Sequence, residues 1–249
     1  MPIVTHRAAV RPRAYVRVQG PDAAEFLQRM VSNDVEQDAD VFSALLLTAK
    51  GRIIAPLRVW RRGADDFLLL TEPELGEVVR SALVRARFAA KCEVEPEEHS
   101  SLVVFGVAEG LPGEVPGTVE VLDSDLDVSL KPEELERTRI ETRVPAWGKE
   151  LDDSVLPAEA GLDRTHISFT KGCYPGQEPI ARLHYRGHAN RVLRKIEVEN
   201  AQPGDEIRHG DKVVGRITSA VPGVALGYVR TEVPEDAEVE IGAAKARLH

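Results

Sequence analysis

The sequence has few cysteines, few aromatic residues and no long apolar run. Only two cysteines, Cys92 and Cys173, occur among 249 residues, and they lie far apart in the chain. Two thiols are too few for a disulfide framework, and a [4Fe–4S] cluster normally takes four thiolates. One copy of the chain therefore cannot hold such a cluster in the usual way. The shortage of cysteines is typical of a reducing compartment, and we expect a cytoplasmic protein.

Other absences exclude further classes of protein. No stretch of about 18 apolar residues occurs, and residues 1–7 lack the apolar part of a signal peptide, so we expect no membrane contact. The formal net charge of −9 argues against a general nucleic-acid-binding surface. His184 and His188 have a spacing that metal ligands use, but no paired cysteines or carboxylates accompany them. We therefore expect no metal centre.

What is present is enough for a packed core, because 43% of the residues are hydrophobic. Helical spacing of apolar residues predicts helices over 21–30, 73–89 and 131–137, and alternation predicts strands over 15–18, 41–47, 52–60, 67–71, 102–107 and 119–130. Short turns join the strands between 41 and 71 into an antiparallel meander. Strands and helices do not alternate regularly, so the fold class is α+β with mostly antiparallel sheets and packed helices.

The carboxy-terminal part has a different texture. Strand-like segments at 192–198, 206–219, 224–229 and 237–248 follow one another without any helical period. This pattern predicts a small all-β module, a barrel. We therefore divide the chain into an α+β body of two intertwined subdomains over residues 1–188 and a β-barrel domain over residues 189–249.

The most informative segment is Lys171-Gly172-Cys173-Tyr174-Pro175-Gly176-Gln177-Glu178. Its glycines and proline predict a bend that presents the thiol of Cys173. Lys171 has two candidate roles: to lower the pKa of that thiol, or to bind a loop carbonyl. The alternative for Cys173 is a buried, inert residue, which is what we expect of Cys92. Gln177 and Glu178 can open a short helix.

The motif places the chain near a known family. With Leu156-Pro157-Ala158-Glu159-Ala160-Gly161-Leu162 before it and Ala181-Arg182-Leu183-His184-Tyr185-Arg186-Gly187-His188 after it, the segment resembles the YgfZ family of folate-binding proteins. These are relatives of the aminomethyltransferase (T-protein) of the glycine cleavage system. Weaker similarity covers Gly20-Pro21-Asp22-Ala23, Gly51-Arg52-Ile53-Ile54 and the β module.

The resemblance implies a ring of three subdomains around a hole in which tetrahydrofolate fits. It implies a role in the assembly or repair of iron–sulfur proteins and, in bacteria, in the thiolation of tRNA. The implied partners are a folate and iron–sulfur proteins or their assembly factors, with RNA less favoured. Catalytic roles fall to Cys173 and Lys171.

The chain departs from the transferase at its catalytic acids. Aminomethyltransferases carry a pair of aspartates after the Gly-x-Ile-x run, and here those positions are Ala55 and Pro56. Neither side chain can accept a proton or stabilise a developing iminium charge. Glycine cleavage is therefore rejected, and whether the protein is an enzyme stays open.

Two regions are candidates for binding the folate. Arg139-Ile140-Glu141 matches the segment whose glutamate binds the pterin ring in the transferase, and a carboxylate can accept the ring N–H and the 2-amino group as a forked pair. The alternative is a solvated glutamate at the end of a strand. Arg182 and Arg186 begin a basic segment that continues with Arg191, Arg194 and Lys195.

This basic segment can meet a folate's glutamate tail, a phosphate of tRNA or an acidic partner. Salt bridges between the body and the β module are the alternative. Tyr185 can stack on a pterin or nucleotide, or simply pack.

Three hypotheses follow from these observations. The leading one is a tetrahydrofolate-binding accessory protein that supports iron–sulfur proteins, and tRNA modification in bacteria, through a reactive cysteine. The second is a folate-dependent one-carbon transferase or demethylase of another substrate. The third is a non-catalytic module that docks a protein or an RNA.

Overall fold

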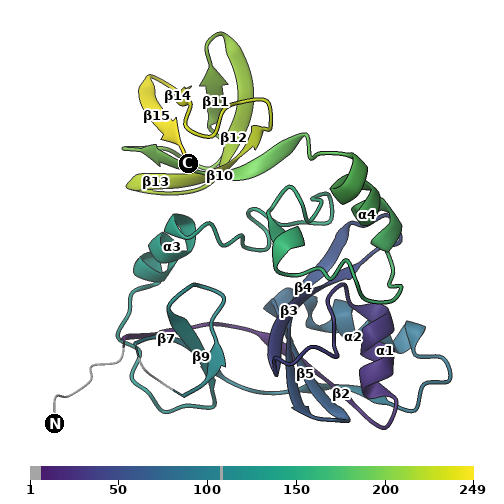
Figure 1. The fold of residues 1–249 in the computed structure, drawn as a ribbon. Helices are drawn as coiled ribbons and strands as arrows, with labels where there is room; N and C mark the ends of the chain where they lie inside the picture. Colours follow the sequence, from purple (N-terminus) through teal and green to yellow (C-terminus); the bar gives the residue numbers. More distant parts are fainter. Residues whose placement is uncertain (1–6, 107–108) are drawn as a thin grey trace.

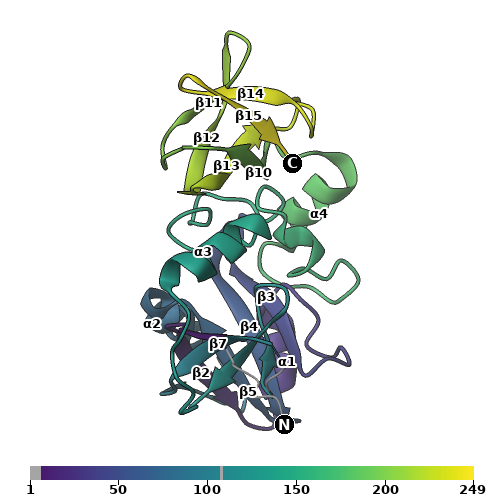
Figure 2. The ribbon, with the colours of Figure 1, turned by 90° about the vertical axis from the view of Figure 1, so that its left-hand side faces the viewer.

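Three subdomains lie round a central opening in the computed structural model, which describes residues 7–106 and 109–249 (Figure 1). Seen from the side, the barrel stands above the two sheets of the body (Figure 2). The antiparallel α+β body and the closed barrel confirm the predicted fold class. Residues 1–6, on which part of the signal-peptide expectation rests, and Val107, the end of an expected strand, lie outside the described residues.

The first subdomain is a five-stranded antiparallel sheet in the order β3-β4-β5-β2-β6. Its strands are β2 (Ala14–Gln19), β3 (Val41–Leu47), β4 (Ile53–Gly63), β5 (Asp66–Thr71) and β6 (Glu93–Glu97). Helices α1 (Ala23–Met30) and α2 (Gly76–Ala86) cover one face, because Phe26, Leu27, Val79 and Leu83 pack on the sheet. The predicted meander and the first helix are confirmed.

The second predicted helix is too long at both ends. Residues Pro73–Leu75 form a separate 3₁₀ turn, η1, and α2 ends at Ala86 rather than at residue 89. Phe88 has a positive φ of 45°, a conformation in which an α-helix of L-residues cannot continue. Apolar periodicity alone did not reveal this end.

The second subdomain is a four-stranded sheet in the order β1-β7-β9-β8. Its strands are β1 (Arg7–Val10), β7 (Ser101–Phe105), β8 (Leu111–Pro112) and β9 (Thr118–Leu122). The predicted strand over 119–130 was wrong beyond Leu122, where Asp123 takes a positive φ of 50° and ends the strand. Helix α3 (Pro132–Glu141) follows, and it is longer than the predicted 131–137.

The barrel closes in the order β10-β13-β12-β11-β14-β15. Its strands are β10 (Arg191–Val198), β11 (Glu206–His209), β12 (Lys212–Val221), β13 (Gly223–Arg230), β14 (Glu238–Ile241) and β15 (Ala244–Leu248). The strand-like segment over 206–219 is a hairpin, with its turn at the expected break His209-Gly210-Asp211, and the segment over 237–248 is a second hairpin. Gly210 and Gly242 supply the turns, each with a φ of +60°.

A separate hydrophobic core joins the subdomains. It contains Leu45 of β3, Ile140 of α3, Leu226 of β13 and Ile180 of α4 (Gln177–Arg186). The long segment between α3 and α4, which includes the short 3₁₀ helix η2 (Leu162–Arg164), runs through this junction. The body and the barrel are therefore packed against each other through a shared core.

Candidate functional site

The cysteine-bearing loop is fixed by a close approach of two backbones. Gly176 precedes α4 with a φ of +82°, and a Cβ on it would lie 2.5 Å from the Thr48 oxygen. Only glycine fits here, so the loop packs on the turn between β3 and β4. Tyr174 is buried, whereas Cys173 is exposed. The thiol is presented as the sequence predicted, and Cys92 is buried, with its pKa raised by burial.

Lys171 holds this loop from its other end. Its ammonium group donates to the backbone oxygens of Val31 and Asn33, each at 2.8 Å. Burial of the amine lowers the pKa of Lys171 to about 8. Of the two roles left open by the sequence, the structure shows the contact with loop carbonyls.

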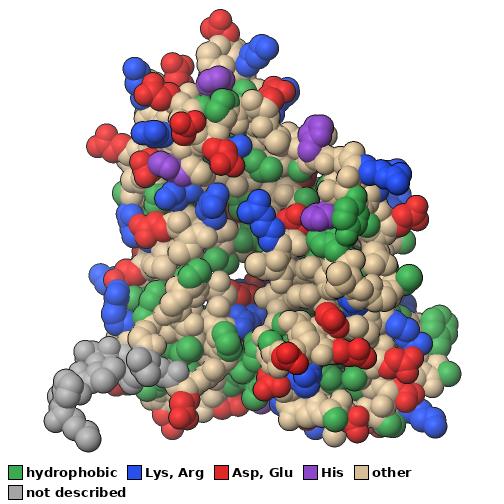
Figure 3. All heavy atoms as spheres, viewed as in Figure 1, with side chains coloured by type: hydrophobic (Ala, Val, Ile, Leu, Met, Phe, Trp, Pro, Cys, Tyr) green, Lys and Arg blue, Asp and Glu red, His purple; other side chains and the backbone are tan. Residues whose placement is uncertain are grey.

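A central cavity of about 510 Å³ lies between the first subdomain, the loop after β8 of the second subdomain and the segment that follows α3. Figure 3 shows the opening below the barrel, with charged side chains visible inside it. A neighbouring cavity of about 400 Å³ shares the wall formed by Val144, Pro145 and Trp147. Pockets of this size accommodate ligands the size of a folate.

The walls of the central cavity combine apolar and polar side chains. Phe42 and Pro56 come from the neighbouring strands β3 and β4, and Trp147 faces them from the segment after α3. Trp147 is half-buried and packs against two of the hydrophobic cores. Flat, apolar side chains of this kind can hold an aromatic ring between them. Pro56 lines this cavity and Ala55 is buried, so β4 provides no acid at these two positions.

An ion network lies between the two cavities: Glu72 and Glu114 line both of them, and the rest of the network lines only the neighbouring one. Arg13 binds Glu120 through two hydrogen bonds of 2.8 and 2.9 Å, and its Nη2 lies 2.9 Å from Oε2 of Glu114. Arg11 binds Glu72 and the same Oε2 of Glu114. Burial opposes the ionised form of Glu114, but Arg13 and Arg11 outweigh it and hold its pKa far below the usual range. The carboxylate therefore stays charged.

Arg58, on the wall of the central cavity, is only partly satisfied. It is 5% exposed, its Nη2 donates to the Pro112 oxygen, and its Nε has no partner among the described residues. Burial lowers the pKa of Arg58, and the nearby Glu114 acts in the opposite direction. His166 lines the same cavity, and burial lowers its pKa to about 4, so the imidazole is neutral at pH 7.

Sequence reasoning missed Arg58, Glu114 and His166. A signal existed for Arg58, because it lies two residues beyond Pro56 and therefore on the same face of β4. Glu114 follows a two-residue strand in a glycine- and proline-rich loop, where no periodicity indicates which side chains point inward.

The predicted pterin contact lies elsewhere in the structure. Glu141 is the last residue of α3, not the end of a strand, and is exposed, with its carboxylate 3.2 Å from Arg137. It is not among the residues that line the central cavity. Arg139 lines the neighbouring cavity, but its guanidinium binds Glu136, Glu150, the Val144 oxygen and Ser219.

The predicted basic residues lie on α4. Arg182 and Arg186 line a separate, mainly apolar cavity of about 480 Å³ behind the cysteine-bearing loop. The ring of His184 stacks on Phe169 at 3.9 Å, and Tyr185 is 67% exposed. Helix α4, which follows the cysteine-bearing loop, therefore carries Arg182, Tyr185 and Arg186. None of these three residues lines the central cavity.

Salt bridges account for other parts of the basic segment. Arg191 binds Glu159 at 3.2 Å, and Arg194 is buried with its Nη1 3.9 Å from Glu235. Among the described residues, no cluster of three or more His, Cys, Asp or Glu side chains is arranged to hold a metal ion. No helix within residues 7–106 and 109–249 is long and apolar enough to cross a membrane.

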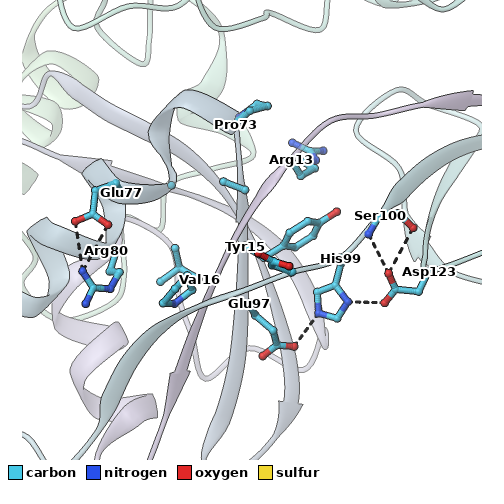
Figure 4. Close-up of a pocket in the computed structure, with 14 residues that line it drawn as sticks. Arg13, Tyr15, Val16, Pro73, Glu77, Arg80, Glu97, His99, Ser100 and Asp123 are labelled. Atoms are coloured by element: carbon cyan, nitrogen blue, oxygen red, sulfur yellow. Dashed lines mark hydrogen bonds and ion pairs between the residues drawn. The ribbon is translucent and has the colours of Figure 1, made fainter.

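A further hollow, on the outer side of the two sheets, is organised by His99. Figure 4 shows the imidazole between two carboxylates, with Glu97 on one side and Asp123 on the other. The distances are 2.7 Å from Nε2 to Glu97 and 2.5 Å from Nδ1 to Asp123. Burial opposes the charged imidazole, but the two acids outweigh it and raise the pKa of His99. The contact joins β6 of the first sheet to the end of β9 in the second.

The fold is that of an aminomethyltransferase. Aminomethyltransferase T of the glycine cleavage system from Bartonella henselae superposes with a TM-score of 0.81 at 17% identity, over 98% of this chain and 85% of that one. Residues 191–249 match the family of the CAF17 C-terminal beta-barrel domain.

Sequence relatives refine this class. Iron-sulfur cluster assembly factor IBA57 from Mus musculus is 28% identical, over 88% of this chain and 76% of its own length. The tRNA-modifying protein YgfZ from Klebsiella pneumoniae is 26% identical, over 84% and 78%. Together these similarities support a member of the YgfZ/IBA57 family that is related to the aminomethyltransferases.

Proposed function

We propose that the protein binds tetrahydrofolate in the central cavity and supports the assembly or repair of iron–sulfur proteins through Cys173. The observation that carries the proposal is the cavity of about 510 Å³ at the centre of an aminomethyltransferase fold, whose lining combines apolar side chains with charged ones. Relatives named for iron–sulfur assembly and for tRNA modification point to the same process. We place this activity in the cytoplasm.

The residues present fit a folate. Phe42 and Trp147 offer apolar surfaces for a flat ring, and Arg58 carries a buried N–H without a partner. Buried donors without partners are unfavourable, so a ligand acceptor at this position would be stabilising. Glu141 remains a second candidate for the pterin ring, and it would first have to release Arg137.

Cys173 supplies the chemistry at the surface. A thiolate is the form of cysteine that binds iron, and Cys173 is the exposed one of the two cysteines. A cluster normally takes four thiolates, so the other ligands must come from a partner protein. Cys173 would then hold a partner's cluster or iron only transiently. Arg182, Arg186 and Tyr185 would form the surface beside it, on α4.

Binding can be tested by equilibrium dialysis with tetrahydrofolate under anaerobic conditions. Trp147 lines the cavity, so ligand binding should also quench its fluorescence, and Trp60→Phe gives a version with that single reporter. Absence of binding in both measurements would contradict the folate part of the proposal.

The cellular role can be tested by complementation. Cells without the protein should lose activity of an aconitase-type cluster enzyme while glycine cleavage stays intact. The wild-type gene should restore it, and Cys173→Ser should not. Full rescue by Cys173→Ser would show that the thiol is not the working group, and loss of glycine cleavage would favour a one-carbon transferase.

A further inference from the structure

Two residues that line the central cavity, Arg58 and Glu114, each keep a hydrogen-bonding atom that no described residue engages, one a donor and one an acceptor. The donor is Nε of Arg58, which has no partner among the described residues. The acceptor is Oε1 of Glu114, because both arginines that bind this carboxylate do so through Oε2. Both residues line the cavity. Such an arrangement is complementary to a ligand edge that carries an acceptor beside donors.

The two groups are fixed in place by the protein and do not satisfy each other. Arg58 is held by the Pro112 oxygen, across the gap between the first and second sheets. Glu114 is held by Arg11 and Arg13. No ion pair within 4 Å joins Arg58 to any carboxylate of the described residues, although Glu114 is near enough to influence its charge. A buried guanidinium in this state is costly unless a ligand completes its contacts.

A 2-amino-4-oxo pyrimidine ring has the matching edge. Its 4-oxo group accepts a hydrogen bond, and the adjacent ring N–H and 2-amino group donate. We infer that Arg58 binds the 4-oxo group of a pterin and that Glu114 accepts from its ring N–H and 2-amino group, so these residues, rather than Glu141, select the ligand. This inference rests on the proposed folate binding and names the residues that would read the ring.

His166 supports the same assignment. Its imidazole is neutral at pH 7, so it adds no positive charge beside Arg58. Its Nδ1 lies 2.8 Å from the Thr165 hydroxyl. Phe42, on the neighbouring strand β3, and Trp147 also line the cavity, and their apolar surfaces suit the faces of the ring and the aminobenzoyl group that follows it.

The first test changes the ligand and leaves the protein intact. Tetrahydrofolate and its 4-amino analogue, tetrahydroaminopterin, differ at the group that Arg58 would bind and at the adjacent ring N–H, which the analogue lacks and Glu114 would bind. We expect the wild-type protein to bind tetrahydrofolate at least tenfold more tightly than the analogue. The 4-amino group is a hydrogen-bond donor, so it cannot pair with the donor of Arg58. Equal dissociation constants would overturn the inference but leave the proposed function standing. Binding of neither ligand would contradict the proposed function itself.

The second test changes the protein. Arg58→Met should reduce the preference between the two ligands, and Glu114→Gln should weaken tetrahydrofolate binding about tenfold to hundredfold. Glu141→Ala should leave binding unchanged. Glu120→Gln is the matched control, because Glu120 binds the same Arg13 but does not line the central cavity. A loss of binding in Glu141→Ala with none in Glu114→Gln would overturn the assignment.

The third test distinguishes the source of the ring, because guanine has the same edge. Guanosine lacks the aminobenzoyl group that the apolar side chains would cover, so it should not displace tetrahydrofolate at equal concentration. Competition as strong as that of unlabelled tetrahydrofolate would overturn the assignment to a pterin. Thermal unfolding of each variant, followed by circular dichroism, shows which variants are folded. The comparison of ligands on the wild-type protein does not depend on the variants.

Discussion

The ammonium group of Lys171 lies 2.8 Å from the backbone oxygen of Asn33, and this contact ties the cysteine-bearing loop to the wall of the central cavity. Asn33 in turn donates to the Ser43 oxygen of β3 at 2.7 Å. The loop that presents Cys173 and the cavity proposed for folate are therefore connected by direct hydrogen bonds.

Removing Lys171 should loosen that connection. Lys171→Met leaves the oxygens of Val31 and Asn33 without their donor, so we expect a loss of about 1–3 kcal/mol in the free energy of unfolding, measured in urea. Lys50→Met is the control, because Lys50 is exposed and has no ion pair in the described part of the chain. Equal stability of both variants would show that the contacts contribute little.

Cys173 should react with iodoacetamide before Cys92. Cys173 is exposed, whereas Cys92 is buried in the core beneath α1 and α2, where burial also raises the pKa of its thiol. The thiolate is the reactive form, so both accessibility and ionisation favour Cys173. Mass spectrometry of peptides after brief labelling at pH 7.5 should find the modification on Cys173. Cys173→Ser should then label only after unfolding in urea, and early labelling of Cys92 would contradict the structure.

How far the sequence predicted this molecule depended on how local each feature is. The meander, α1 and the barrel strands follow from periodicity and turn residues, and the exposure of Cys173 follows from Gly172 and Gly176. The end of α2 at Phe88 and the end of β9 at Asp123 depend on positive φ angles, which side-chain type does not reveal. Local patterns therefore predicted the elements better than their ends.

The candidate site was harder to predict because its residues are far apart in the chain. Arg58, Glu114 and His166 meet only because three segments fold against one another, and none of them lies in the recognisable motif. Arg139 illustrates the opposite case. The motif suggested a ligand contact, but the folded chain engages its guanidinium with protein partners.

Arg139 should matter for the junction between the body and the barrel. Its guanidinium binds the buried Glu150 at 2.8 Å and Ser219 of β12 at 2.7 Å, and Glu150 accepts from Ser219 as well. Breaking a buried pair leaves one charge uncompensated, so Arg139→Met should lower the free energy of unfolding by about 3–5 kcal/mol.

The neighbouring Arg137 offers a comparison at the same junction. It pairs with Glu141 and donates to the Pro222 oxygen of the barrel, but both contacts are exposed, and an exposed salt bridge contributes at most about 1 kcal/mol. Urea unfolding of the two methionine variants should therefore differ by several kcal/mol. If Arg137→Met proves as damaging as Arg139→Met, the buried network does not hold the barrel to the body.

His99 should make the joint between the two sheets sensitive to pH. Its pKa is raised in the folded protein by Asp123 and Glu97, against the opposing effect of burial. A group whose pKa is higher in the folded than in the unfolded protein stabilises the fold fully at pH values below its unfolded pKa, which is near 6.5 for histidine. This contribution is lost as the pH rises through the pKa of the folded state. The pKa values of Glu97 and Asp123 are lowered, so their contribution disappears as pH falls below about 4. The contact should therefore be strongest between about pH 4 and 6.5.

His99→Gln tests this dependence, because glutamine cannot carry the charge. The variant should be less stable than wild type by about 1–2 kcal/mol at pH 5.5, with the difference shrinking as pH rises above about 6.5. His209→Gln is the control, since His209 is exposed at the end of β11. The measurement is urea unfolding of all three proteins at pH 5.5, 6.5, 7.5 and 8.5. A difference for His99→Gln that stays constant over this range would mean that the histidine joins the sheets by packing, with no contribution from its charge.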